Sequence, residues 1–422
     1  MFNKRFIQWF NLQKKKQKIS CRIKNLNKLK NWLKNEKLIS HVSGKFFKII
    51  GLDVKSNMIG KNWDQPIIVQ KELGILGIIK DKVKNKYLLQ AKVEPGNKNK
   101  LQLSPTVQAT KSNYERVHGG KKIPYLNIFL KNKLKFVSQS EQGYRYLYKS
   151  NYNSLLYINK NIKTLSNYFW LDKKDIKNLI KKKRIFNMDT ISVFSTFIEK
   201  NKLDTPLNSM NKIFKWILNK DNLYNLSIKI KPLKKLKDWK VGDDKITHKK
   251  NNHFSVIGIN IKSNKREIKE WDQPIIKGKK LAFVGFIICR FNNTNHYLCK
   301  YNKKPGLKTS TLSCSVNTSD IISYKKNNKL STFQNYLLNN ILLKKNKKFR
   351  TLYDNILSDE GGRFYNCEIK YKALLINQEL KLRLPDDYIW VSQNQMIKMI
   401  ERKKIDIEAR LLFGCINIDK IK

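Results

Sequence analysis

Two segments near residue 100 concentrate side chains that can bind a polar ligand and transfer protons. Residues 90–97 combine Gln, Lys, Glu and Asn with a Pro95-Gly96 turn. Residues 104–120 keep Thr, Gln, Ser, Asn, Tyr, Arg and His in a chain otherwise rich in Lys, Asn and Ile. Amides and hydroxyls hydrogen-bond to polar ligands, Arg binds diphosphates, and Glu, Tyr or His transfers protons. The two segments therefore predict a ligand site. The alternative is an ordinary edge strand on which Glu94 is a solvated carboxylate.

The stretches around these segments predict the elements that would carry them. Apolar and alternating runs predict strands over residues 46–50, 74–79 and 87–93, the last of which ends at the Pro-Gly turn. Residues 170–182 and 390–402 place apolar side chains at helical spacing and predict helices. Strands and helices mixed in this way predict an α+β fold.

The chain contains an internal repeat over almost its whole length. Residues 63–67 and 271–275 both read Trp-Asp-Gln-Pro-Ile. The further matched pairs are Trp9 and Trp216, Trp32 and Trp239, His41 and His248, Gly51 and Gly258, and Trp170 and Trp390. The offset between the pairs grows slowly along the chain, as loop insertions in a duplicated domain would produce. We therefore predict two homologous domains, residues 1–205 and 206–422, with the Lys-rich stretch 228–250 as variable surface at the start of the second.

The two copies differ at their polar positions. Lys304 stands opposite Glu94, although the Pro-Gly turn is present in both copies. Asn317 stands opposite Gln108, and the string Ser-Asn-Tyr-Glu-Arg of residues 112–116 has no counterpart. A residue that serves only the architecture should remain in both copies. The loss from one copy predicts a ligand site that is complete in the first half and eroded in the second.

A set of strings, in collinear order between about residues 32 and 416, resembles the sequences of one family. These strings are residues 63–68, 72–77, 90–97, 105–114, 140–143, 187–190, 359–364 and 408–410. The family is that of the NDP-hexose 2,3-dehydratases. The resemblance implies a tandem duplication of a Nudix-like α/β/α domain and a homodimer. It also implies one nucleotide-sugar site in each half, with only one of the two catalytic, and dTDP-4-keto-6-deoxyglucose as the substrate.

The reaction that the resemblance implies is a β-elimination of water. The ketone at carbon 4 acidifies the hydrogen on carbon 3, a base removes that proton, and the hydroxyl on carbon 2 leaves as water. The product is a dTDP-3,4-diketo-2,6-dideoxyhexose. Because the ketone already accepts the electrons, the reaction needs no flavin, nicotinamide or metal, and we expect no cofactor. The metal-binding box of ordinary Nudix hydrolases does not occur in the sequence.

The resemblance assigns candidate roles to residues that lie mostly in the first half, with Arg363 and Tyr365 from the second. Glu94, Tyr114 and His118 are the candidates for proton transfer, and the sequence does not decide which is the base. We expect the substrate to be bound by Gln65, Lys92, Asn97, Gln108, Thr110, Lys111, Ser112, Asn113, Arg116, Arg363 and Tyr365. Within this set, the cations Lys92, Lys111 and Arg116 are candidates for the diphosphate.

The composition limits the alternatives. The 422 residues include 88 Lys and Arg against 32 Asp and Glu, for a net charge of +56. Such a charge is typical of nucleic-acid binding, but only 12 of the 88 cations are Arg and the Lys are spread over nearly every segment. The cysteines and histidines form no cluster with metal-ligand spacing. The sequence shows neither an apolar run long enough for a membrane helix nor a secretory signal. We therefore expect no specific nucleic-acid partner, no membrane and a cytoplasmic location.

Three functions remain in consideration from the sequence. The first is the dehydratase of deoxysugar biosynthesis. The second is a catalytically inactive homologue that still binds a nucleotide sugar, and the third is a basic nucleic-acid-binding protein. Turnover of the keto sugar distinguishes the first from the second, and a steeply salt-dependent affinity for DNA or RNA would indicate the third.

Overall fold

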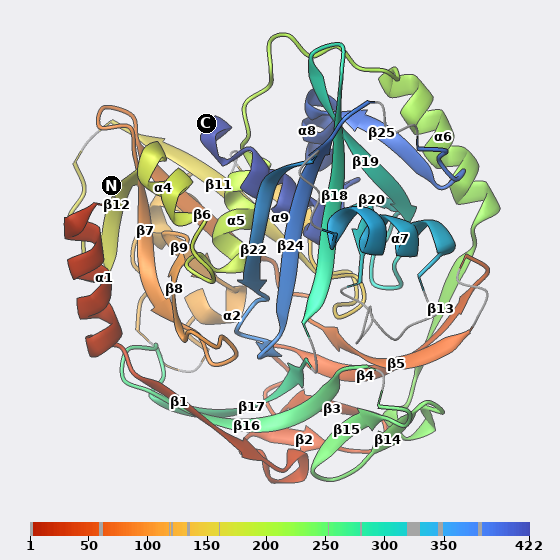
Figure 1. The fold of residues 1–422 in the computed structure, drawn as a ribbon. Coiled ribbons are helices and arrows are strands. Elements are labelled where there is room, and N and C mark those ends of the chain that lie inside the picture. The colour runs from red at the N-terminus through yellow and green to blue at the C-terminus, as the bar shows by residue number, and fades with distance from the viewer. Residues whose placement is uncertain are drawn as a thin grey trace.

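Each half of the chain contributes one large and one small β-sheet to the fold. The computed structural model describes residues 3–58, 62–117, 119, 121–132, 136–159, 161–251, 253–278, 281–318, 330–344, 349–378 and 382–422. Within these residues the strands form four sheets. In Figure 1 the two large sheets lie on either side of a pair of helices, and the two small sheets form a curved layer below them. The predicted α+β fold is confirmed.

The large sheet of the first half carries the segments that the sequence predicts as a site. Its strands are β6 (Gly74–Asp81), β7 (Lys86–Val93), β8 (Leu101–Ser104), β9 (Val107–Ala109), β10 (Val137–Ser140), β11 (Ser150–Ile158) and β12 (Tyr168–Asp172). Strand β6 pairs in parallel with β11 and antiparallel with β7. Strand β7 also pairs antiparallel with β8, and the turn after β7 connects these two strands. The strands predicted over 74–79 and 87–93 are confirmed by β6 and β7.

The large sheet of the second half repeats this arrangement. Its strands are β18 (Ala282–Phe291), β19 (Thr294–Asn302), β20 (Thr311–Ser313), β21 (Val316–Asn317), β22 (Arg350–Ser358), β24 (Glu368–Ile376) and β25 (Tyr388–Ser392). In the first half Gln108 is the register partner of Leu76, and in the second half Asn317 is the register partner of Val284. The two polar residues therefore occupy equivalent positions, as the repeat predicts.

The small sheets join the two halves because each borrows a strand from the other. The first sheet consists of β2 (Trp32–Lys34), β3 (Leu38–His41), β4 (Lys48–Ser56), β5 (Trp63–Val69) and the borrowed β13 (Leu226–Lys231). The second consists of β14 (Trp239–Val241), β15 (Lys245–His248), β16 (Ser255–Ser263), β17 (Glu270–Lys277), β23 (Phe364–Tyr365) and the borrowed β1 (Ile19–Lys24). The Lys-rich stretch 228–250, which we expected to be variable surface, thus begins inside a strand paired with the first half.

The Asp of each Trp-Asp-Gln-Pro-Ile string holds the borrowed strand in place. Asp64 of the first half accepts hydrogen bonds from Lys231 Nζ at 3.0 Å and from the backbone nitrogen of Lys237 at 2.6 Å. Asp272 of the second half accepts one from Lys24 Nζ at 2.6 Å. Both carboxylates are buried, where a charge needs such donors to remain stable. The repeated string is therefore a structural link between the halves.

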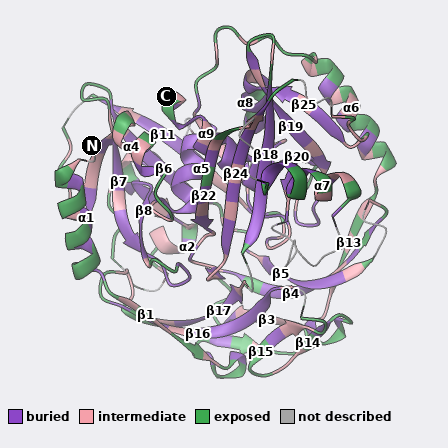
Figure 2. Cartoon of the chain, viewed as in Figure 1, coloured by how far each residue is buried: buried purple, intermediate pink, exposed green. Residues whose placement is uncertain are grey.

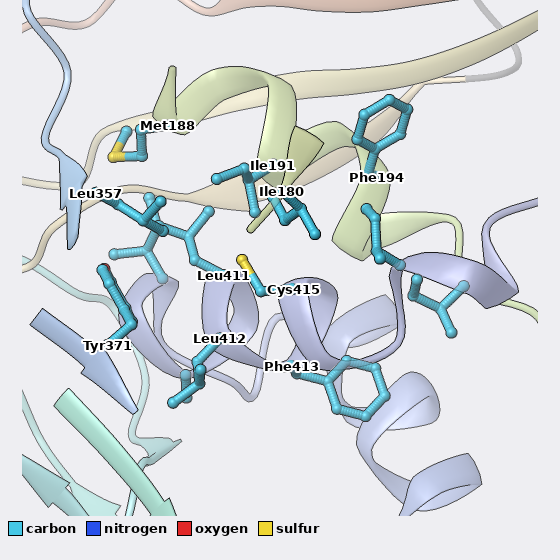
Figure 3. Close-up of a cluster of buried hydrophobic side chains, with 14 of the residues drawn as sticks. Ile180, Met188, Ile191, Phe194, Leu357, Tyr371, Leu411, Leu412, Phe413 and Cys415 are labelled. Carbon is cyan, nitrogen blue, oxygen red and sulfur yellow. The ribbon is translucent and has the colours of Figure 1, made fainter. Parts of the chain in front are cut away.

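Two helices fill the space between the large sheets. They are α5 (Met188–Thr196) and α9 (Ile407–Ile416), the equivalent helices of the two halves, and they lie side by side in Figure 1. Every residue of α5 is buried. Figure 3 shows side chains of this core: Ile191 and Phe194 come from α5, and Leu411 and Phe413 come from α9. This central core cluster therefore contains side chains of both halves.

The remaining helices pack around the sheets. They are α1 (Lys4–Lys16), α2 (Lys111–Tyr114), α3 (Leu126–Leu130), α4 (Lys173–Leu179), α6 (Met210–Leu223), α7 (Thr332–Tyr336) and α8 (Gln393–Glu401). Helix α3, for example, lays Phe129 over Gly77 on the outer face of the first large sheet. Short helical turns cover Leu26–Lys28, Leu233–Lys235, Leu337–Leu342 and Ile418–Lys420. Figure 2 shows exposed residues on α1 and α6 at opposite sides of the molecule and buried residues through the centre. No helix in the described part of the chain has the length and apolar character needed to cross a membrane.

The helices predicted over 170–182 and 390–402 begin later than expected. Trp170 lies in β12 and Trp390 lies in β25, and the helices α4 and α8 start after capping residues Asp172 and Ser392. Aromatic and β-branched residues that end a strand also satisfy the apolar positions of a helix, so periodicity alone did not separate the two elements.

Candidate functional site

The turn after β7 reaches across to the second half. The backbone nitrogen of Gly96 donates to the carbonyl of Gly361 at 2.8 Å, and Asn366 donates to the carbonyl of Gly96 at 2.8 Å. A Cβ atom at Gly96 would lie 1.7 Å from the carbonyl oxygen of Phe364, so only glycine fits here. The contact fixes the position of Glu94, two residues before Gly96, against both halves of the chain.

The carboxylate of Glu94 is buried and has one oxygen available. Its side chain accepts a hydrogen bond at Oε1 from Gln108 Nε2 at 2.9 Å. Gln108 in turn accepts one at Oε1 from Asn187 Nδ2 at 3.0 Å. Lys92 Nζ lies 3.9 Å from Glu94 Oε1. The other oxygen, Oε2, is buried and accepts no hydrogen bond from the described residues. A buried acceptor without a donor is costly, which favours a ligand that supplies one.

The start of α5 supplies two more polar residues to this site. Asn187 caps the helix, since its side-chain oxygen accepts from the backbone nitrogen of Thr190 at 3.0 Å, while its amide nitrogen binds Gln108. Asp189 is in the first turn and is buried. Burial, together with the negative charges of Glu360, Glu141 and Glu94, raises the pKa of Asp189 well above its usual value. Asp189 is therefore suited to hold a proton.

A cluster of buried acids and bases continues from the site into the interface between the halves. Tyr146 donates its hydroxyl to Glu360 Oε2 at 2.5 Å across the interface. Glu141 accepts from Asn151 at 2.7 Å, and burial raises the pKa of Glu141 to about 7. Arg410 of α9 is fully buried and donates to the hydroxyl of Ser192 at 2.6 Å. These contacts link the site electrostatically to the second half.

The equivalent position in the second half is filled by an ion cluster of the chain itself. Lys304, which stands where the first half has Glu94, is 1% exposed. Its Nζ lies 2.8 Å from Glu408 Oε2 and 3.2 Å from Asp406 Oδ2. Asp406 and Glu408 occupy the places of Asn187 and Asp189, at the start of the equivalent helix. The second-half position therefore holds a buried Lys between two acids, whereas in the first half Glu94 has a looser contact with Lys92, at 3.9 Å, and an Oε2 that accepts no hydrogen bond from the described residues.

The structure brings together part of the predicted site. Lys92, Glu94 and Gln108 are in direct contact, and Lys92 Nζ also donates to the carbonyl of Gln108 at 3.5 Å. Asn97 lies in the same turn, but its amide nitrogen donates to Gln102 and its side chain packs on Gly361. Asn97 therefore supports the turn by the contacts that the structure shows.

A second group of predicted residues lies on and beside α2. Its members are Thr110, Lys111, Ser112, Asn113, Tyr114 and Arg116. Glu72 holds this group, since its Oε2 accepts from the hydroxyl of Ser112 at 2.7 Å. Lys111 pairs with Glu115 at 3.5 Å on the surface, and Tyr114 packs on the outer face of the large sheet. Among the contacts of the described residues none joins Tyr114 to Glu94.

The last predicted residues serve other contacts or cannot be placed. Gln65 donates to the carbonyl of Tyr144 at 2.7 Å and accepts from the indole of Trp63 at 2.9 Å. The guanidinium of Arg363 lies over the ring of Phe47, with 4.3 Å to the centroid. Lys100 Nζ lies over the ring of Tyr365, with 5.6 Å to its centroid. His118 lies outside the described residues.

Sequence reasoning did not assign site roles to Asn187, Asp189, Glu141 or Glu360. The sequence signal that could have identified them is that they lie in strings that resemble the family. Their positions in the sequence are far from Glu94, and only the packing of α5 and of the interface loop brings them close. Only the structure shows that the equivalent of Asp189, Glu408, pairs with Lys304, the residue that replaces Glu94.

The fold and the site define a class of protein: a tandemly duplicated α+β chain with a buried acidic site in the first half and a buried Lys–acid cluster at the equivalent position of the second. The model of the family described as NDP-hexose 2,3-dehydratase matches residues 3–197 and 210–416. The chain belongs to the NDP-hexose 2,3-dehydratase family.

Curated relatives agree with this family. The dTDP-4-dehydro-6-deoxy-alpha-D-glucopyranose 2,3-dehydratase of Saccharopolyspora spinosa is 30% identical over 429 residues, which cover 93% of this chain and 86% of the relative. The protein of the same description from Amycolatopsis orientalis is 30% identical over 396 residues, which cover 89% of this chain and 82% of the relative.

Among solved structures, a hydrolase of ADP compounds matches with a TM-score of 0.19 and 12% identity, over 33% of this chain and 69% of that one. A score this low does not establish a common fold, and the Nudix-like character of each half stays an implication of the family resemblance.

Proposed function

We propose that this chain is an active dehydratase that removes the 2-hydroxyl of dTDP-4-keto-6-deoxyglucose as water. The observation that carries the proposal is the carboxylate of Glu94, buried with Oε2 unpartnered among the described residues, in a chain of the NDP-hexose 2,3-dehydratase family. The names of the curated relatives support the choice of substrate. The working site is the one in the first half, because Lys304 neutralises the acids of the other.

The proposed reaction needs one group that accepts a proton and one that donates it. The base takes the proton from carbon 3, and the electron pair of that bond forms the enolate with the ketone at carbon 4. The enolate then expels the hydroxyl from carbon 2, which leaves as water when a donor protonates it. The resulting enol tautomerises to the 3,4-diketo-2,6-dideoxy sugar. Each positioned proton-transfer group contributes roughly 10²–10⁴-fold to the rate.

Three residues near the turn fit these roles. Glu94 Oε2 is the acceptor for the carbon-3 proton, and Gln108 holds the carboxylate in place through its hydrogen bond to Oε1. Asp189, whose pKa burial and neighbouring carboxylates raise, is a candidate for the donor to the leaving hydroxyl. Tyr114 and His118 remain alternatives for proton transfer.

A turnover assay tests the proposal. The full chain is incubated with dTDP-4-keto-6-deoxyglucose and a ketoreductase that traps the diketo product, and the nucleotide sugars are analysed by mass spectrometry. We expect a trapped product that differs from the substrate by the loss of one water and by the gain of the two hydrogens that the ketoreductase adds. A chain that binds dTDP but returns the sugar unchanged would instead be the inactive nucleotide-sugar-binding homologue.

The remaining expectations from the family resemblance are proposals of the same kind. We propose a homodimer, two domains divided near residues 205 and 206, and a cytoplasmic location. Light scattering after size-exclusion chromatography measures the oligomeric state.

A further inference from the structure

A hairpin of the second half reaches the site of the first. The loop between β16 and β17 carries Arg266, whose Nη1 donates to the carbonyl oxygen of Val93 at 3.3 Å. Val93 lies between Lys92 and Glu94, so the guanidinium stands beside both site residues. Strand β1, which pairs with β16, also contacts the site turn, since Cys21 Sγ donates to the carbonyl of Pro95 at 3.4 Å. The hairpin is thus held near Glu94 by its own contact to Val93 and by the contact that its partner strand β1 makes to Pro95.

The hairpin places the cation Arg266 near the buried cation Lys92 of the site. Lys92 is buried, and its pKa is lowered by that burial and then by the charge of Arg266, while Glu94 and Glu267 oppose the shift. Two neighbouring cations in a partly buried place repel each other unless an anion lies near them. An anion is therefore the ligand for which this pair of side chains is suited.

In the structure, a side chain of the hairpin itself takes the place of such an anion. Glu267 Oε2 lies 3.4 Å from Arg266 Nε. The charge of Arg266 lowers the pKa of Glu267 to about 2, and Lys92 contributes in the same direction against burial. Arg266 Nε is nevertheless buried without a hydrogen-bond partner among the described residues. Glu267 therefore pairs with Arg266, while Lys92 has Glu94 Oε1 at 3.9 Å, and Arg266 Nε still lacks a hydrogen-bond acceptor among the described residues.

We propose that this hairpin is the diphosphate clamp of the first-half site, with Arg266 and Lys92 as the cations and Glu267 as an internal anion that the ligand displaces. The proposal rests on the proposed function, because it takes the diphosphate of a dTDP-sugar as the occupant. The planar guanidinium offers two parallel N–H donors to phosphate oxygens, and the ammonium offers a point charge. The second half thus completes the site of the first.

The clamp predicts opposite effects of two adjacent substitutions. Arg266→Ala removes a cation that binds the diphosphate and weakens binding. Glu267→Gln removes the anion that competes with the diphosphate and strengthens binding. A hairpin with a merely structural role would respond differently, because loss of either member of an Arg–Glu contact would disturb the loop in the same direction.

Calorimetric titration of the full chain with dTDP tests the clamp. We expect Arg266→Ala to weaken dTDP binding about 10- to 100-fold, Arg266→Lys to restore part of the loss, and Glu267→Gln to tighten binding a few-fold. Lys265→Ala is the matched control, since Lys265 is an exposed cation of the same hairpin and its loss should leave the affinity within about two-fold. Thermal unfolding shows that each variant is folded.

The outcomes separate the clamp from the proposed function. Unchanged dTDP affinity in Arg266→Ala, or weaker binding in Glu267→Gln, overturns the clamp and leaves the dehydratase proposal in place. A wild-type chain that binds no dTDP overturns both. Both proposals are supported if the wild type turns over the keto sugar, Arg266→Ala loses affinity for dTDP and Glu267→Gln gains affinity.

Discussion

Lys304 Nζ lies 2.8 Å from Glu408 Oε2 in a fully buried contact at the start of α9. The equivalent residues of the first half are Glu94 and Asp189, two acids. One substitution between the copies therefore exchanges an ion pair for a pair of carboxyl groups. In the first half, burial and the neighbouring carboxylates raise the pKa of Asp189 well above its usual value, and Glu94 Oε2 has no hydrogen-bond donor among the described residues, so a ligand can supply one.

Replacing Lys304 should destabilise the protein. In Lys304→Met the buried carboxylates of Asp406 and Glu408 lose their nearest cation, and breaking a buried ion pair in this way costs about 3–5 kcal/mol. Urea unfolding followed by circular dichroism measures the change. Lys308→Met, an exposed neighbour, should stay within about 0.5 kcal/mol of wild type. Equal stability of the two variants would contradict the structural role of Lys304.

Glu94→Gln should abolish turnover and spare nucleotide binding. The amide keeps the size of the side chain but does not accept the carbon-3 proton, so kcat should fall by roughly 10²–10⁴-fold. Affinity for dTDP, measured by calorimetry, should change little. Glu115→Gln, on the exposed end of α2, is the control and should keep wild-type kcat. Full activity of Glu94→Gln would remove Glu94 from the proton-transfer step.

Glu141 makes the stability depend on pH. Burial raises the pKa of its carboxyl group to about 7, against an unfolded value near 4.5. The folded state therefore binds more protons than the unfolded state between these values. The contribution of Glu141 to stability is complete below about pH 4.5 and is lost as the pH rises to about 7. Glu141→Gln should flatten this part of the profile.

The measurement for Glu141 is a series of urea unfolding curves between pH 4.5 and 8, for wild type and Glu141→Gln. Asp359, whose pKa burial also raises to about 7, contributes a slope of the same sign, so the variant should reduce the wild-type slope and not remove it. An unchanged slope in the variant would show that Glu141 is not the titrating group.

Gly96→Ala should separate the two halves at the site. The added Cβ would lie 1.7 Å from the backbone carbonyl of Phe364, which cannot move as a side chain can. The turn that carries Glu94 must shift, so we expect both a loss of stability of about 1–3 kcal/mol and a loss of turnover. Gly119→Ala is the control for crowding, because no atom lies within 4 Å of the Cβ position there, although its positive φ adds some strain. Wild-type turnover in Gly96→Ala would show that the turn tolerates the shift.

Part of the site was predictable because it is local. Lys92 lies at the end of β7 and Glu94 follows it directly after the strand, and Gln108 is 14 residues from Glu94, within one unit of paired strands. The differences between the copies at Lys304 and Asn317 were visible in the sequence and correspond to equivalent structural positions. Asp189 and Arg266 were not assigned, since they are brought to the turn by α5 and by a hairpin of the other half.

The sequence by itself determined the strands β6 and β7, the Pro-Gly turn, the duplication and the family. These features follow from local patterns and from identities between aligned positions. Only the tertiary structure decided that β1 and β13 are exchanged between the halves and that Arg266 lies beside Val93, 173 residues earlier in the chain. The hydrophobic pattern of a strand indicates which of its residues are buried, but it does not indicate which sheet edge the strand pairs with. The pairing depends on how both halves pack around α5 and α9.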